Sequence, residues 1–237
     1  MQAIISASAL VVHYAGRPVV NQLDLSIGAG SVYALLGANG AGKTTTINAL
    51  LGFVKSSAGT IRIGGVSLAD DPSAARSIAY LPENVALYPY MSGVENLQYF
   101  CALAGADIGR EQAGELLSDA GLAATAHHAR VSTYSKGMRQ KVGLSIAYAR
   151  RAPAMLLDEP TSGLDPSAAN DFAQRIRAAG ERGMAVMMAT HDLFNAKQVA
   201  DRIGIMKAGR IVAEYDAARV GHQELEDVYL EHARAAA

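Results

Sequence analysis

The segment Gly37-Ala38-Asn39-Gly40-Ala41-Gly42-Lys43-Thr44 constrains the fold more than any other part of the sequence. It fits the pattern G-x-x-x-x-G-K-[ST]. The apolar run 32–36 precedes it, and the helix-compatible residues 45–51 follow it. A strand, a glycine loop and a helix in this order point backbone N–H groups and a helix N-terminus at one anion, so the segment predicts a phosphate-binding loop. The alternative is a chance glycine-rich turn, which the Lys-Thr ending and the flanking residues disfavour.

The loop also predicts which phosphate contacts its side chains make. In loops of this kind the lysine reaches the β- and γ-phosphates of a nucleoside triphosphate, and the following hydroxyl ligates Mg²⁺. These roles fall to Lys43 and Thr44. The loop therefore predicts a bound nucleoside triphosphate with its magnesium ion.

The bulk composition narrows the class of protein. The chain has 237 residues, of which 50% are hydrophobic and 18% charged, which is typical of one or two soluble globular domains. A net charge of -1 argues against a general nucleic-acid-binding surface. Because Cys101 is the only cysteine, no internal disulfide is expected.

The sequence shows neither a membrane span nor a secretion signal. No apolar run approaches the roughly 18 to 20 residues that cross a bilayer. The first five residues carry no lysine or arginine, unlike a signal peptide. We therefore expect a cytoplasmic protein, and any membrane span of its assembly must come from another chain.

The pattern of apolar and helix-favouring residues along the sequence predicts an α/β core interrupted by a group of helices. Residues 9–12 and 23–27 are expected to form antiparallel strands, and residues 60–63 lead into a hairpin at Gly64-Gly65. Between residues 86 and 152 Ala, Leu and Glu dominate at helical spacing. We predict a single domain over 1–237, and its parts are a core of 1–85 and 153–220, a helical subdomain of 86–152 and a C-terminal tail of 221–237.

Two carboxylates follow a second buried strand. The apolar run 154–157 ends in Asp158 and Glu159. Parallel sheets place their ligands at the carboxyl ends of strands, so these side chains should face the glycine loop. Asp158 can hold Mg²⁺ opposite Thr44, and Glu159 can accept a proton from an attacking water. Without the glycine loop, an ordinary acidic pair at a strand end would be the better interpretation.

A serine and a glycine begin a predicted helix within residues 134–140. Ser135 and Gly137 form a candidate anion site at a helix N-terminus. From physics alone, an ordinary N-cap at Ser135 is the better interpretation.

The order and spacing of these motifs resemble the ATP-binding cassette family, the motor subunits of ABC transporters. Residues 134–140 resemble its signature motif, and 161–165 resemble its D-loop. His191 stands at the place of the switch histidine, Glu83 at that of the Q-loop glutamine, and Tyr14 at that of the aromatic residue that stacks on adenine. The match covers residues 4 to about 230.

The resemblance implies a fold and a set of site residues. The fold is a P-loop NTPase (RecA-like) α/β core with an antiparallel β-subdomain and an inserted helical subdomain. The implied catalytic residues are Lys43, Glu159 and His191, and the implied Mg²⁺ site is formed by Thr44, Glu83 and Asp158. The residues implied to bind ATP are Tyr14, Gly37, Ala38, Asn39, Gly40, Ala41, Gly42, Lys43, Thr44, Thr45, Ser135, Gly137 and Asp165.

The resemblance also implies partners. Two cassettes, which we expect to be identical, would bind two ATP molecules head to tail, so that Ser135 and Gly137 of one subunit close over the γ-phosphate held by the other. Glu159 would polarise the attacking water, His191 would contact the γ-phosphate and Asp165 would communicate across the dimer. The groove near residues 83–90 would pass the motion to a separate transmembrane permease.

Two departures from the family pattern indicate a branch of it. The signature has Tyr134, Lys136 and Met138 where Leu, Gly and Gln are usual, and Glu83 replaces a glutamine. Both variants resemble the branch that serves ABC-2 type exporters. Within it, residues 81–85 and 133–140 resemble the ATPase subunit of the transporter that matures the copper site of nitrous oxide reductase.

Two functions of other classes remain as alternatives. A soluble mechanical ATPase of translation or DNA repair usually has two cassettes or long coiled coils, and this chain shows one cassette and no heptads. A non-hydrolysing nucleotide-dependent regulator would not need Glu159 and His191.

Two further groups of residues have a functional and a structural interpretation. His127-His128 can be read as a metal pair, but we expect a solvated stretch because adjacent helix positions do not face each other. Met184, Met187 and Met188 can be read as soft-metal ligands, but core filling is favoured because two of them lie in a buried strand.

Overall fold

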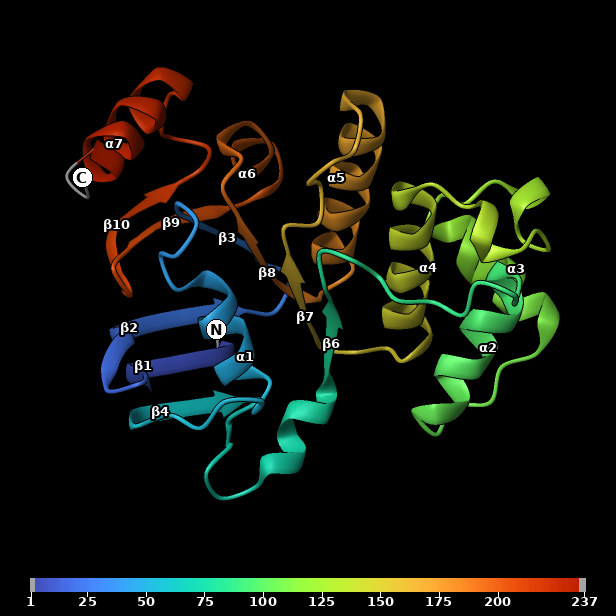
Figure 1. Cartoon of the computed structure of the whole chain (residues 1–237), viewed down its shortest axis with the longest axis horizontal. Coiled ribbons are helices and arrows are strands. Elements are labelled where there is room, and N and C mark those ends of the chain that lie inside the picture. Colours follow the sequence, from blue (N-terminus) through green and yellow to red (C-terminus); the bar gives the residue numbers. More distant parts are fainter. Residues whose placement is uncertain (1–2, 235–237) are drawn as a thin grey trace.

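Two β-sheets and a group of helices make up the protein in the computed structural model, which describes residues 3–234 (Figure 1). The smaller sheet is antiparallel, with strand order β2-β1-β4-β5. Its strands are β1 (Ala3–Tyr14), β2 (Arg17–Gly28), β4 (Ala58–Ile63) and β5 (Val66–Ser67). The predicted hairpin at Gly64-Gly65 joins β4 to β5, and both glycines have positive φ angles, 58° and 84°.

The larger sheet has the order β10-β9-β3-β8-β7-β6. Its strands are β3 (Val32–Leu36), β6 (Ile78–Leu81), β7 (Ala154–Asp158), β8 (Ala185–Thr190), β9 (Arg202–Lys207) and β10 (Arg210–Asp216). All pairs are parallel except β9 with β10. Every residue of β3, β7 and β8 is buried, because structure covers both faces of the sheet. The predicted α/β fold with a mostly parallel sheet is confirmed.

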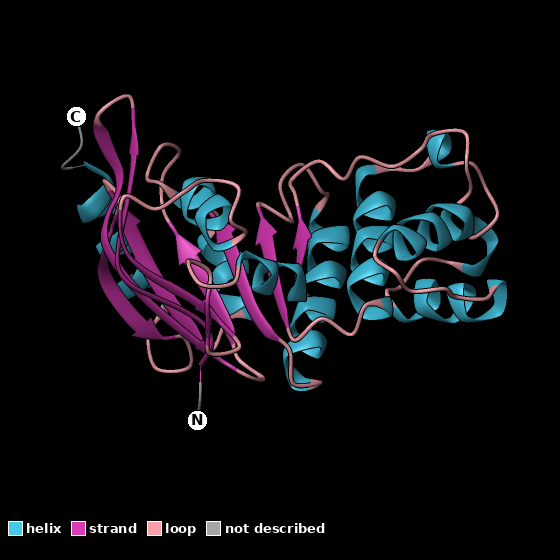
Figure 2. Ribbon diagram, turned by 90° about the horizontal axis from the view of Figure 1, so that it is seen from below, coloured by secondary structure: helices cyan, strands magenta, loops and turns pink. Residues whose placement is uncertain are grey.

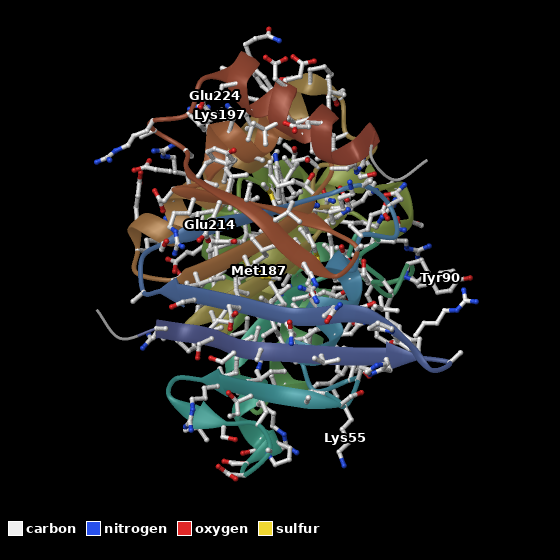
Figure 3. The ribbon with its side chains drawn as sticks, turned by 90° about the vertical axis from the view of Figure 1, so that its left-hand side faces the viewer. Lys55, Tyr90, Met187, Lys197, Glu214 and Glu224 are labelled. Atoms are coloured by element: carbon white, nitrogen blue, oxygen red, sulfur yellow. The ribbon has the colours of Figure 1, made fainter. Side chains whose placement is uncertain are left out.

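Helices cover both faces of the larger sheet. On one face α1 (Lys43–Leu50) packs between the two sheets, and Met187 of β8 points into this core (Figures 1 and 3). The opposite face carries α5 (Pro166–Glu181), α6 (Leu193–Val199) and α7 (His222–Arg234). The predicted tail 221–237 thus contains α7, and its residues 235–237, like residues 1–2 of the predicted domain, lie outside the described part of the chain.

The remaining helices form a lobe beside the sheets, between β6 and β7 in the sequence (Figure 2). They are α2 (Gly93–Leu103), α3 (Arg110–Asp119) and α4 (Lys136–Ala149). Short 3-10 helices lie at Pro72–Ser77, Ala124–Ala126 and Val131–Thr133. The lobe has its own apolar core, and α4 packs on both cores, with Val142 in the lobe and Leu144 in the main body. Helix α4 therefore joins the lobe to the main body.

Burial decides two of the sequence expectations. The expectation that His127-His128 is solvated is wrong for His127, which is 6% exposed with its Nε2 3.0 Å from the Leu122 carbonyl oxygen. Met187 and Met188 are buried, as core filling predicts. Between residues 3 and 234, no helix has the combination of length and apolar character that crossing a membrane demands.

Candidate active site

The register of the parallel sheet brings the carboxyl ends of three strands together. Leu36 at the end of β3 pairs with Thr190 at the end of β8, and Asp158 at the end of β7 pairs with Ala189. The glycine loop follows the first of these ends. The Gly37 N–H donates to the Thr190 carbonyl, 3.1 Å away, which fixes the loop beside β8.

Tight packing of the loop explains two of its glycines. A Cβ on Gly37 would lie 2.6 Å from the Met206 carbonyl oxygen, and one on Gly42 would lie 2.7 Å from the Val19 carbonyl oxygen. Gly42 also has a φ of 110°, which disfavours other residues. Gly40 has open space around it and a φ of 82°. The loop therefore requires glycine for space at Gly37, for backbone conformation at Gly40, and for both reasons at Gly42.

Lys43 begins α1 and turns back over the loop. Its ammonium donates to the carbonyl oxygens of Gly37 and Ala38, at 2.7 and 3.3 Å. The side chain is 6% exposed, so its charge acts in a poorly solvated place. The first turn of α1 has no acidic residue and no side-chain cap, so its N–H groups are available to an anion.

Asp158 is a buried carboxylate with spare acceptor capacity. Its Oδ1 is buried and has no hydrogen-bond partner among the described residues. Burial raises the pKa of this carboxyl, while a hydrogen bond with the Thr44 side chain acts in the opposite direction. A hydroxyl beside an unpartnered carboxylate oxygen fits a hard cation such as Mg²⁺. Within residues 3–234, no group of three His, Cys, Asp or Glu side chains is arranged to hold a metal ion by itself, so such an ion would need phosphate oxygens and water as further ligands.

Glu159 is held in place by groups from three elements. Its Oε1 lies 3.3 Å from Lys43 Nζ, and its Oε2 lies 2.9 Å from His191 Nδ1 and 3.2 Å from Thr190 Oγ1. The backbone of Glu159 has a φ of 45°, which costs about 1–2 kcal/mol for a residue with a Cβ. The N–H of Glu159 donates to the Ala189 carbonyl at 2.9 Å, which helps to hold this conformation. Strain of this kind is common at functional sites.

Glu83 lies in the segment after β6. Its Oε1 is 3.4 Å from Lys136 Nζ and accepts a hydrogen bond of 3.0 Å from Ser162 Oγ. The hydrogen bond from Ser162, aided by Lys136, lowers the pKa of the Glu83 carboxyl. Glu83 therefore carries a negative charge at neutral pH.

A pocket of about 250 Å³ collects most of the predicted residues. It is lined by Val19, Ala38, Asn39, Gly40, Gly42, Lys43, Thr44, Thr45, Glu83, Asp158 and Glu159. Gly37 and Ala41 form the loop behind this surface, and Ala41 is 7% exposed. His191 reaches the pocket through Glu159.

Besides Gly37 and Ala41, four more predicted nucleotide-binding residues are absent from the pocket lining. Tyr14 is exposed at the end of β1. Ser135 caps α4 by accepting from the Met138 N–H at 3.3 Å, and Asp165 caps α5 by accepting from the Ala168 N–H at 3.0 Å. Gly137 is buried in the first turn of α4. Within one chain, Ser135 and Asp165 thus act as helix caps.

Sequence reasoning missed three groups around the site. Val19 lines the pocket from β2, and no motif marks it. Thr190 supports Glu159, and its only sequence signal is its place at the end of a buried strand. Ser162 binds Glu83 across 79 residues of sequence, so only the folded chain reveals this contact.

Known proteins share both the sequence and the fold. The family model described as ABC transporter matches residues 20–162. The chain is 37% identical over 213 residues to the daunorubicin/doxorubicin resistance ATP-binding protein of Streptomyces peucetius, covering 89% of this chain and 64% of that protein. It is 31% identical over 218 residues to the lantibiotic transport ATP-binding protein of Streptococcus pyogenes, covering 91% of both chains.

Solved structures of ABC transporter cassettes have the same fold as this chain. The ATP-binding subunit of an ABC transporter superposes with a TM-score of 0.82 at 29% identity, covering 97% of this chain and 99% of the other. A dimeric bacterial ABC transporter cassette gives a TM-score of 0.80 at 25% identity, covering 90% and 98%.

The length of the relatives limits what can be transferred from them. Across several curated relatives the chain spans between 64% and 70% of their length. The match nevertheless includes the glycine loop, Asp158 and Glu159. The chain therefore belongs to the ABC transporter family, as an ATP-binding cassette.

Proposed function

We propose that this cassette is the ATPase subunit of an ABC-2 type membrane exporter and drives a separate transmembrane permease. The convergence of Lys43, Asp158, Glu159 and His191 beside the glycine loop carries the proposal. Support for export comes from relatives whose names specify daunorubicin resistance, Nod factor export and lantibiotic transport. Through the permease, the cassette would lie on the inner face of the cell membrane.

The phosphates of ATP would lie on the loop 37–45. Lys43 and the N–H groups at the start of α1 would bind the β- and γ-phosphates. Thr44 and Asp158 would hold Mg²⁺, with Glu83 near enough to the pocket to contribute. When bound, the ion would neutralise charge on the phosphates as the γ-phosphoryl group leaves. Tyr14 would stack on the adenine.

Glu159 would act on the attacking water. Its carboxylate is within contact of His191 and Thr190, which orient it. Glu159 would accept a proton from the water as the oxygen attacks the γ-phosphorus, and the bond to the β-γ bridging oxygen breaks. His191 would contact the γ-phosphate. The products are ADP and inorganic phosphate.

A second copy of the chain would complete the site. Ser135, which is exposed, and Gly137 lie at the start of α4 and do not line their own subunit's pocket, so this helix start is suited to cap a phosphate held by the other subunit. Asp165 would lie near the same interface. Hydrolysis removes the γ-phosphate that both subunits hold, and the dimer then opens.

The lobe side of the protein offers a surface for the permease. Tyr90 is 83% exposed and projects from the segment between β6 and α2 (Figure 3). Tyr88 packs edge-on against Tyr99, with ring centroids 4.9 Å apart, so the aromatic side chains are held in place. Exposed aromatic groups of this kind are typical of protein interfaces.

Two experiments test the proposed function. Steady-state hydrolysis of Mg-ATP should fall to background with Lys43→Ala, and equal hydrolysis by that variant would contradict the assignment of the loop. An affinity-tagged chain expressed in its native cell should retain the permease during purification. Tyr90→Ala should weaken that retention without changing ATP binding, whereas Tyr14→Ala should weaken ATP binding alone.

The same experiments address the other functions. Recovery of ribosomes or DNA instead of a permease would favour a mechanical ATPase. ATP binding without turnover would favour a regulator. The role in copper-site maturation of nitrous oxide reductase stays a prediction, which co-purification with a copper-binding partner would support.

A further inference from the structure

An ion pair joins two positions at which the sequence departs from the usual family pattern. Lys136 Nζ at the start of α4 lies 3.4 Å from Glu83 Oε1, which follows β6 of the larger sheet. Glycine is usual at the first position and glutamine at the second. The two unusual charges therefore offset each other, across the junction between the lobe and the sheet.

A third element meets this pair. Ser162, three residues after Glu159, donates to the same Glu83 oxygen at 3.0 Å. A Cβ placed on Gly163 would lie 3.7 Å from the Lys136 ammonium. The loop after β7, the start of α4 and the segment after β6 thus converge on one carboxylate.

Glu83 also lines the nucleotide pocket, beside Asp158 and Glu159. The negative charge of Glu83 contributes to the raised pKa of Asp158. Three carboxylates at a triphosphate site repel the ligand unless cations offset them. Lys43 faces Glu159, and Lys136 faces Glu83.

The contact between α4 and the segment after β6 has a further unusual feature. Gln140 is fully buried, and neither its Oε1 nor its Nε2 has a hydrogen-bond partner among the described residues. It lies four residues after Lys136 and three before Gly143, hence on the same face of α4. At Gly143 this face is so close to Leu81 that a Cβ would lie 2.2 Å from Leu81 Cδ1. Gln140 therefore makes no hydrogen bond across this contact among the described residues, whereas Lys136 makes an ion pair across it.

We propose that Lys136 is a positioning residue that binds the Glu83 carboxylate at the rim of the nucleotide pocket and limits its repulsion of the ATP phosphates. The proposal rests on the proposed function, since it concerns the same pocket. The effect should be greatest without Mg²⁺, because a bound cation offsets the same charge.

A double-mutant cycle tests this in the full chain. The variants are Lys136→Met, Glu83→Gln and the double variant, and binding of trinitrophenyl-ATP is measured by fluorescence in EDTA and in Mg²⁺. In EDTA, Lys136→Met should weaken binding about threefold, the effect of a partly exposed ion pair. In the Glu83→Gln background the same substitution should have almost no effect. Lys136→Arg, which keeps the charge, should bind as the native chain does.

Two results would overturn the inference. An equal loss from Lys136→Met in both backgrounds would mean that Lys136 acts on the phosphates or the fold directly. No loss in either background would mean that the pair does not affect the pocket. Thermal unfolding checks that each variant is folded, and Lys136→Gln replaces Lys136→Met if that variant is not.

Lys43→Ala separates this inference from the proposed function. If the native chain binds no nucleotide, or if Lys43→Ala binds it equally well, the proposed function fails and the inference fails with it. If these controls behave as expected but the cycle is additive, the inference alone is wrong.

Discussion

Lys43 Nζ lies 3.3 Å from Glu159 Oε1, with the lysine side chain 6% and the glutamate side chain 14% exposed. The ammonium expected to bind phosphate therefore contacts the carboxylate expected to activate water. Under the proposed function, ATP would compete with this contact, because the phosphates and the carboxylate would share the three N–H donors of one ammonium. Binding and catalysis are thus coupled through one charge.

Replacing that carboxylate should separate binding from hydrolysis. Glu159→Gln removes the anion that competes for Lys43, so ATP should bind severalfold more tightly, by about 1 kcal/mol. Hydrolysis should fall by about 100-fold or more, because the proton acceptor is lost. Equilibrium ATP titration and steady-state phosphate release measure the two effects.

The same variant tests the dimer. With ATP bound and not hydrolysed, Glu159→Gln should elute as a dimer in size-exclusion chromatography, and Glu159→Gln with Ser135→Ala should do so less readily. A Glu159→Gln chain that stays monomeric at saturating ATP would count heavily against a site shared between subunits.

Replacing Glu159 with glycine should relieve the strain in its backbone. Its φ of 45° is strained for any residue with a Cβ. Glu159→Gly and Glu159→Ala both lose the carboxylate, but only glycine relieves the strain, so Glu159→Gly should be more stable than Glu159→Ala by about 1 kcal/mol. Urea unfolding of the two variants measures the difference, and equal midpoints would show that the strain is relieved elsewhere.

Two glycines of the loop should differ in sensitivity. Gly42→Ala combines a φ of 110° with a Cβ 2.7 Å from the Val19 carbonyl oxygen, so it should destabilise the fold by more than about 2 kcal/mol and abolish nucleotide binding. Gly40→Ala faces only the cost of its φ, 82°, and should destabilise by about 1 kcal/mol. Thermal unfolding with nucleotide titration compares them, and a Gly40→Ala loss as large as that of Gly42→Ala would contradict the packing argument.

Asp158 should make stability depend on pH. Its pKa is raised by burial, so the folded chain binds this proton more tightly than the unfolded chain does. The carboxyl therefore costs stability as the pH rises from its ordinary value through the raised one. Asp158→Asn should be more stable than the native chain by about 1 kcal/mol at about pH 7, and the gain should shrink toward about pH 4. Melting curves at both pH values measure the gain, and a gain that is larger at low pH would reverse the argument.

A matched ligand measurement completes the Asp158 test. The neutral amide is a weaker ligand for Mg²⁺ than a carboxylate, so Asp158→Asn should reduce the gain in ATP affinity that Mg²⁺ provides. In EDTA the variant should bind ATP at least as tightly as the native chain, because one of the carboxylates that repel the phosphates is removed. If Mg²⁺ strengthens binding equally in both, Asp158 is not part of the metal site.

Local patterns in the sequence predicted much of the fold. The apolar runs of β3, β7 and β8 are typical of a sheet that is covered on both faces. The glycine loop follows β3, and β7 and β8 end in Asp158 and Thr190. The burial of His127 was not predictable, because its partner, the Leu122 carbonyl, is a main-chain group that no side-chain pattern marks.

The sequence by itself determined the phosphate-binding loop, the acidic strand end and the family resemblance. These depend on residues that are adjacent in the chain, where spacing alone sets the geometry. Only the tertiary structure decided that Lys43 faces Glu159, that Thr190 supports Glu159 and that Lys136 pairs with Glu83. Each of these contacts joins two residues that are between 31 and 116 positions apart in the sequence. Such distances are set by strand register and helix packing, which no local pattern of residues specifies.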